Sequence, residues 1–242
     1  MLPAGRLCLA ILDFAPAKAM PPHPLGIRAD WTISVGVRSE VNAGVSGSTV
    51  GKLATDPSRR LQGTQNLELV LPECDKGLGK VITALDSPAL IDGVKLSRLT
   101  VYPDDRGYFL EIQRLGQGLA AHFPAATSQI SAAMNYAGTV KAFHYHLHQT
   151  DCWSPVKGLF QVALADLRWG SPTYGQRNTL YVGPLQPWQI LIPPGVAHGY
   201  KVIGREEALL VYMTDRFYNP QDEGRIAFDH ISINYDWETQ RK

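Results

Sequence analysis

Short apolar runs separated by polar turns recur along the chain from about Leu90 onward. The runs are rich in β-branched and aromatic residues, and turn sequences such as Asp104-Asp-Arg-Gly107 and Pro193-Pro-Gly195 lie between them. This pattern predicts strands, because an amphipathic helix would show apolar residues three and four positions apart. Many short strands at near-even spacing favour an all-β sandwich or barrel. The predicted strands span Val94–Tyr102, Gly107–Ile112, Gln129–Asn135, Thr139–His146, Gly158–Leu167, Gln176–Val182, Gln189–Ile192, Gly199–Ile203 and Ala208–Asp215, and one helix is predicted around Gly118–Phe123.

The first 88 residues lack this pattern. Residues 42–52 are rich in Gly, Ser and Thr and look like a phosphate loop, but Leu53 follows the lysine where Ser or Thr is needed. Residues 1–19 faintly resemble a secretory signal, although Asp13 interrupts their apolar run. We therefore expect a disordered or irregular N-terminal extension over residues 1–88 and a folded domain over residues 89–242.

The composition limits the kinds of partner that we expect the protein to bind. The formal net charge of the 242 residues is +1, so no basic stripe points to nucleic acid or to an anionic membrane surface. No apolar run approaches the roughly 20 residues of a membrane helix. The three cysteines are far apart and in no paired spacing, which is typical of reduced thiols and predicts a cytoplasmic protein.

Histidines are concentrated in one block of the chain. His144, His146 and His148 are two positions apart, Asp151 follows them, and His198 comes shortly after the Pro193-Pro-Gly195 turn. Positions two apart on a strand point to the same face of the sheet. The block therefore predicts a functional site in which imidazoles and a carboxylate lie together.

Several motifs of residues 90–237 resemble one known family. They include Asp105-Arg-Gly-Tyr-Phe-Leu-Glu111, Gly138-Thr-Val-Lys-Ala-Phe-His144, Ile192–Tyr200 and Tyr218-Asn-Pro220, in matching order and spacing. The family is that of the cupin-fold sugar-nucleotide epimerases, specifically dTDP-4-dehydrorhamnose 3,5-epimerase. The resemblance implies a cupin jelly roll (a double-stranded β-helix) and a homodimer. It also implies an isomerase without a cofactor that inverts centres beside the ketone of a nucleotide-linked 4-keto-6-deoxysugar.

The resemblance also implies roles for single residues. His144 matches the base that takes the proton, and His198 faces the mouth of the barrel. The tyrosine acid of the family falls on Val211, with Tyr212 next to it, and the lysine near the developing oxyanion falls on Asp151. Both departures put activity in doubt. The residues expected to hold the sugar nucleotide are Arg106, Phe109, Glu111, Gln129, Lys141 and Tyr218.

A second interpretation concerns metal. The spacing of His144, His146 and Asp151 between Gly138 and Gly158 follows the general cupin metal signature, with His198 as a further ligand, whereas the epimerases have glutamine and lysine at positions 146 and 151. Three imidazoles and one carboxylate suit a divalent transition metal. The alternatives are thus a metal-dependent cupin isomerase or dioxygenase, and a non-catalytic sugar-nucleotide binding protein.

Overall fold

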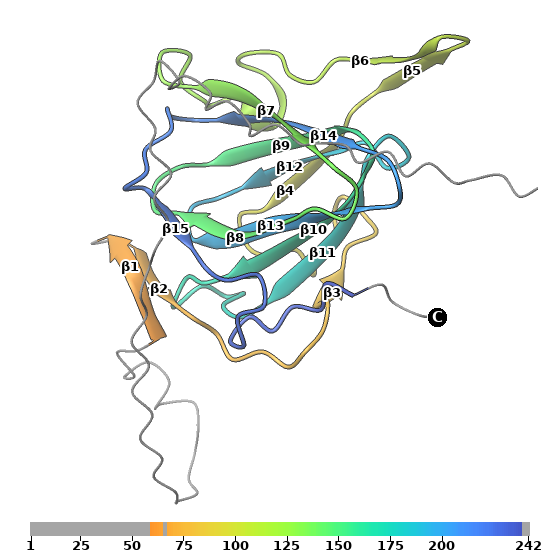
Figure 1. The fold of residues 1–242 in the computed structure, drawn as a ribbon. Helices are drawn as coiled ribbons and strands as arrows, with labels where there is room; N and C mark the ends of the chain where they lie inside the picture. The colour runs from red at the N-terminus through yellow and green to blue at the C-terminus, as the bar shows by residue number, and fades with distance from the viewer. Residues whose placement is uncertain (1–58, 65–66, 239–242) are drawn as a thin grey trace, which may run out of the picture. The chain divides into compact units, whose positions relative to one another are not determined.

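The computed structural model describes residues 59–64 and 67–238 of the chain. These residues form two large sheets that face each other, as Figure 1 shows, and the strands within both sheets are antiparallel except where β3 joins β11. One sheet has the order β15 (Glu223–Arg225), β8 (Val140–His146), β13 (Val196–Ile203), β10 (Leu159–Asp166), β11 (Arg177–Val182) and β3 (Lys80–Val81). The other has the order β4 (Lys95–Arg98), β12 (Trp188–Ile192), β9 (Asp151–Lys157), β14 (Ala208–Thr214) and β7 (Gln129–Asn135). Two hairpins complete the strands: β1 (Arg60–Thr64) with β2 (Leu67–Val70), and β5 (Val101–Asp104) with β6 (Gly107–Leu110).

The apolar core lies between the two sheets. Phe160, Val162 and Leu164 of β10 are fully buried there, and Ile190 and Ile192 of β12 belong to the same cluster. Ala163 and Ala165, which alternate with them along β10, are buried in a second cluster on the outer face of the six-stranded sheet. A strand that is covered on both faces has an almost continuous run of apolar residues, and the sequence of β10 shows such a run.

The second cluster corrects the predicted start of the folded domain. Leu69 of β2 is completely buried in it, and Ile82, just after β3, is buried in the core. Residues 67–88 therefore contribute to the packed region, which begins before the boundary predicted at residue 89. Their strands are too short to give a visible pattern, since β3 has two residues. Residues 1–58, with the signal-like and glycine-rich stretches, lie outside the described residues.

The central strand of the five-stranded sheet, β9, was not predicted. β9 contains Pro155, which cannot donate to a ladder and therefore argues against an interior strand. The structure accommodates it at an irregularity, where the pairing of β14 shifts from Lys157 to Pro155 and passes over one residue. This strand carries Asp151 into the site.

The prediction of one helix was wrong in both the type and the length of the element. Gly118–Ala120 form one short 3₁₀ turn, η3, in place of the helix expected up to Phe123. No helix within the described part of the chain is long and apolar enough to cross a membrane.

Candidate active site

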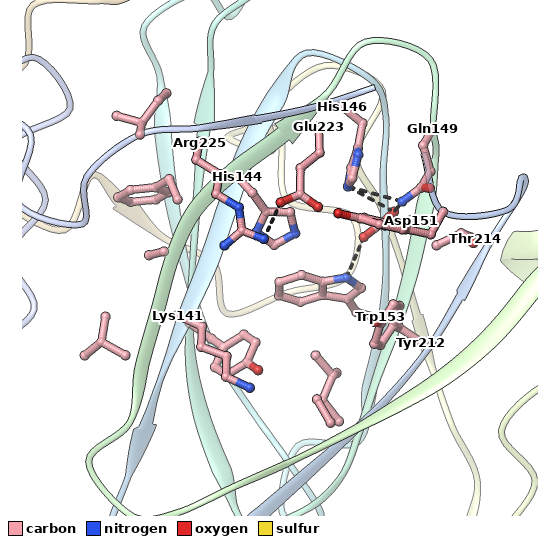
Figure 2. Close-up of a pocket in the computed structure, with 18 of the residues that line it drawn as sticks. Lys141, His144, His146, Gln149, Asp151, Trp153, Tyr212, Thr214, Glu223 and Arg225 are labelled. Atoms are coloured by element: carbon pink, nitrogen blue, oxygen red, sulfur yellow. Dashed lines mark hydrogen bonds and ion pairs between the residues drawn. The ribbon is translucent and has the colours of Figure 1, made fainter. Parts of the chain in front are cut away.

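A cavity of about 770 Å³ opens between the two sheets. Figure 2 shows His144 of β8 on one wall and Tyr212 of β14, which belongs to the other sheet, across from it. A volume of this order fits a small-molecule ligand site. The two sheets thus present different functional groups to the same space.

Strand β8 points its histidines into this cavity because of its alternation. Phe143 and Tyr145 pack into the outer apolar cluster, so His144 and His146 face inward between the sheets. His148 lies beyond the end of the strand and is exposed. The structure therefore brings two of the three histidines of the block into the site, and the third lies in solvent.

The second half of the site comes from β13. His198 is the direct cross-strand partner of His144, and their ring centroids are 4.1 Å apart. Between them the strands approach closely at Gly199, where a Cβ atom would lie only 2.4 Å from Cβ of Ala142. The preceding turn is fixed by Gly195, whose φ of +77° suits glycine and whose N–H donates to the carbonyl of His146.

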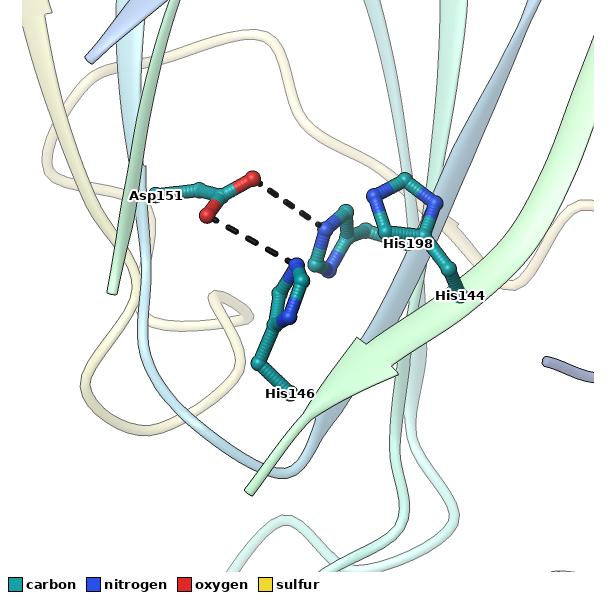
Figure 3. Close-up of side chains that lie close together, drawn as sticks. All are labelled: His144, His146, Asp151 and His198. Carbon is teal, nitrogen blue, oxygen red and sulfur yellow. Dashed lines mark ion pairs between the residues drawn. The ribbon is translucent and has the colours of Figure 1, made fainter. Parts of the chain in front are cut away.

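Asp151 lies at the centre of the polar cluster and is buried. Its Oδ1 accepts from the amide of Gln149 at 2.7 Å, and its Oδ2 accepts from the indole N–H of Trp153 at 3.0 Å. Figure 3 shows that the carboxylate also faces His198 and His146, with Nε2 atoms at 3.5 and 3.8 Å. Burial raises the pKa of Asp151, but His198 and the two histidines of β8 lower it by more, so that the pKa lies well below its usual value. The carboxylate is ionised at neutral pH.

The histidines of β8 are neutral at the same pH. Burial lowers the pKa of His144 well below its usual value, and the charge of His198 adds to this effect while that of Asp151 opposes it. Burial also lowers the pKa of His146. A neutral imidazole has the lone pair that a proton acceptor or a metal ligand needs. His144, partly open to the cavity, is thus in the form that a base requires.

The structure places the tyrosine differently from the family pattern. Val211, at the position matching the tyrosine acid, lines an apolar recess on the outer face of its sheet. Tyr212 lines the cavity and packs beside the core. Tyr212, the residue next to the matching position, is therefore the one that reaches the site.

The residues expected to hold the sugar nucleotide divide into two groups. Gln129, Lys141 and Tyr218 line the cavity. The others do not. Arg106 lies at the turn of the β5–β6 hairpin, where its side chain is 84% exposed and pairs with Asp104. Phe109 and Glu111 line recesses outside the cavity.

Sequence reasoning missed three residues of the site. Arg225 and Glu223 lie on β15, form an ion pair at 2.5 Å and line the cavity, with Arg225 paired in register with His144. No motif marks them, since β15 has only three residues and its pairing with β8 appears in the fold alone. Trp153 is the third; it lines the cavity and donates a hydrogen bond to Asp151.

Comparison with known proteins identifies the same family that the sequence motifs resemble. A family model described as dTDP-4-dehydrorhamnose 3,5-epimerase matches residues 88–242. The spore coat polysaccharide biosynthesis protein SpsL of Bacillus subtilis (strain 168) is 43% identical over 153 residues, which are 62% of this chain and 99% of SpsL. The dTDP-4-dehydrorhamnose 3,5-epimerase of Pseudomonas aeruginosa is 32% identical, with 62% of this chain and 84% of that enzyme covered.

A solved structure is similar in fold as well. It is the dTDP-6-deoxy-D-glucose-3,5-epimerase RmlC from Legionella pneumophila, in complex with dTDP-4-keto-L-rhamnose. The TM-score is 0.53 at 26% identity, over 63% of this chain and 82% of that one. The shared fold confirms the predicted jelly roll.

Proposed function

The chain belongs to the dTDP-4-dehydrorhamnose 3,5-epimerase family, a family of isomerases that act on sugar nucleotides, and from this premise we propose its substrate and mechanism. The proposed substrate is a nucleotide-linked 4-keto-6-deoxysugar. His144 takes the proton from a carbon beside the ketone, and Tyr212 returns a proton from the other side.

One observation carries this proposal: a neutral imidazole and a phenol face the same cavity from different sheets. Inversion of a carbon centre needs a proton acceptor on one side of the sugar ring and a proton donor on the other. A single sheet presents its side chains to only one side of a ligand lying between the sheets. The two walls of the cavity can supply both.

The cavity also supports binding of a charged nucleotide. Lys141 and Arg225 are cationic side chains in its lining, and they suit the diphosphate. Tyr218 offers an aromatic face for a base, and Gln129 a hydrogen-bonding amide. The Legionella pneumophila relative was solved with a dTDP-linked 4-keto sugar, which supports the same ligand class for this chain.

A homodimer belongs to the same proposal. Tyr102 and Phe109 on the β5–β6 hairpin and Ile130 and Met134 on β7 are apolar and exposed in the single chain. β7 is also the edge of its sheet, with one side of its backbone ladder unpaired within the described residues. Pairing with a second copy would cover these groups.

The test is the configuration of the sugar after incubation with the enzyme. With dTDP-4-keto-6-deoxyglucose as substrate, proton NMR reports inversion at C3 and C5 through the ring coupling constants. We expect inversion with the wild-type protein and a rate lower by about 10²- to 10⁴-fold with His144→Asn, the range that general bases contribute. Tight binding of the sugar nucleotide without inversion would replace this proposal with a non-catalytic binding protein.

A further inference from the structure

Three side chains with potential ligand atoms converge beside His144, the proposed base. The Nε2 atom of His198 lies 3.5 Å from Oδ2 of Asp151, and Nε2 of His146 lies 3.8 Å from Oδ1. The three residues are 1%, 2% and 5% exposed, in the order His198, Asp151, His146. Figure 3 shows the carboxylate facing both imidazoles.

The hydrogen bonds fix the tautomer of each ring. Nδ1 of His198 lies 2.8 Å from the carbonyl oxygen of Val196, which only accepts, so Nδ1 carries the hydrogen. In the neutral ring Nε2 then has its lone pair directed at Asp151, and this buried nitrogen has no hydrogen-bond partner among the residues that the structure describes. Nε2 of His146 lies 3.1 Å from the amide nitrogen of Gln149, a donor, so it too presents a lone pair.

The charge of this arrangement is unbalanced. The buried carboxylate of Asp151 lies beside two imidazole nitrogens, and within the part of the chain that the structure describes its ion-pair partners are these histidines. Burying an anion without a cation is costly. A bound cation would lie between the carboxylate and the two imidazoles and contact all three side chains.

The outer contacts match those of histidine metal ligands. Such histidines donate their second ring N–H to a carbonyl or a carboxylate, which orients the ring. His198 donates to Val196, and Nδ1 of His146 lies 4.0 Å from a carboxylate oxygen of the buried Asp222. Among residues 59–64 and 67–238, neither Nδ1 of His146 nor Oδ1 of Asp222 has a hydrogen-bond partner, so a small approach of the two side chains would let them form one.

The spacing is close to that of a coordinated ion. One ligand atom from each of His144, His146, Asp151 and His198 lies within 4.8 Å of the others. Ligand atoms at about 2.1 Å from a tetrahedral metal ion are about 3.4 Å apart, so the 3.5 and 3.8 Å separations between the Asp151 oxygens and the two Nε2 atoms need a contraction of a few tenths of an ångström. The amide of Gln149, which bridges His146 and Asp151, would rotate aside.

We propose that His146, Asp151 and His198 bind a divalent transition-metal ion, and that His144 stays outside the coordination set. His144 is the most exposed of the four and opens to the cavity, where the base must meet the sugar. Two imidazoles and one carboxylate leave coordination positions free for a substrate oxygen. The role of the ion rests on the proposed function: it offsets the charge of Asp151 and polarises the ketone of the sugar.

The test is titration of metal-free, untagged protein with Co²⁺, followed by visible absorption and calorimetry. We expect one Co²⁺ per chain, a d–d absorption band of a nitrogen and oxygen site, and a raised Tm. Asp151→Asn should weaken binding by at least about 100-fold, because it removes a charged ligand. His148→Asn is the matched control, since this imidazole lies two residues from His146 but in solvent, and it should bind Co²⁺ as the wild type does.

The variant His144→Asn tests the metal site separately from the proposed epimerase function. We expect this variant to keep full Co²⁺ binding while it loses inversion of the sugar. Loss of Co²⁺ binding in His144→Asn would overturn the three-residue assignment. Absence of binding in the wild type, or equal binding in Asp151→Asn, would overturn the metal site. Co²⁺ binding without inversion would leave the site standing and refute the function.

Discussion

At the level of single residues, the proposed acceptor and donor of the proton lie on different sheets. His144 is neutral and lies on β8, and Tyr212 lies on β14 of the facing sheet. An acceptor without its opposing donor can still exchange a proton on one side of the ring. It cannot complete an inversion. The two residues should therefore fail in different ways when replaced.

Tyr212→Phe tests this difference. We expect inversion to slow by about 10²-fold or more, while exchange of the sugar proton with solvent continues through His144. Proton NMR in heavy water measures both quantities in one sample. Tyr181→Phe serves as the control, because Tyr181 of β11 is not among the residues lining the cavity. Equal loss of exchange and inversion in Tyr212→Phe would contradict the assigned role.

Sequence reasoning found the histidines because their chemistry and their spacing are both local. His144 and His146 are two apart on one strand, and the turn before His198 is marked by Pro-Pro-Gly. Arg225 was not found, because its place opposite His144 depends on the pairing of two strands far apart in the chain. The sequence also could not show which face of β14 Tyr212 occupies, since this depends on the exact register of the strand.

At the scale of elements, the distance between β8 and β13 sets the geometry of the site. Gly199 lies where these strands approach, and its neighbour His198 pairs with His144. The main chain of Ala142 and Lys141 surrounds the missing side chain, so it cannot move aside without moving β8. The absence of a Cβ atom is thus what holds the two histidines opposite each other.

Gly199→Ala should therefore disturb both stability and activity. A Cβ atom would lie 2.4 Å from Cβ of Ala142 and 2.7 Å from the carbonyl oxygen of Lys141, so the strands must separate. We expect a loss of about 1–3 kcal/mol in the free energy of unfolding, as for overpacked cores. Urea denaturation measures this loss. An unchanged midpoint together with unchanged inversion would show that the close approach is not needed.

The strands themselves were predicted where local pattern and burial agree. The bounds Gln129–Asn135 match β7 as predicted, and β10 stands out by its apolar run. β9 escaped because Pro155 argues against a strand, and its irregular pairing is a tertiary feature. The β2 and β3 strands escaped because they gain their stability from packing on the sheet, not from a pattern of their own.

At the scale of the whole molecule, the exposed apolar face of β7 and the β5–β6 hairpin argue for a homodimer. Ile130→Asp places a charge on this face and should shift the protein toward the monomer in sedimentation equilibrium. Ile231→Asp is the control, because Ile231 is exposed to a similar degree on the C-terminal segment. A monomeric wild type, or a dimer that both variants retain, would contradict this interface.

The proposed function requires that His144 remove a proton from a carbon next to the ketone of a sugar nucleotide. The mass of dTDP-4-keto-6-deoxyglucose recovered after incubation with the protein in heavy water reports this step. We expect a gain of deuterium at C3, C5 or both with the wild type, and none above background with His144→Asn. A sugar nucleotide of unchanged mass, or an equal gain with both proteins, would show that His144 is not the base.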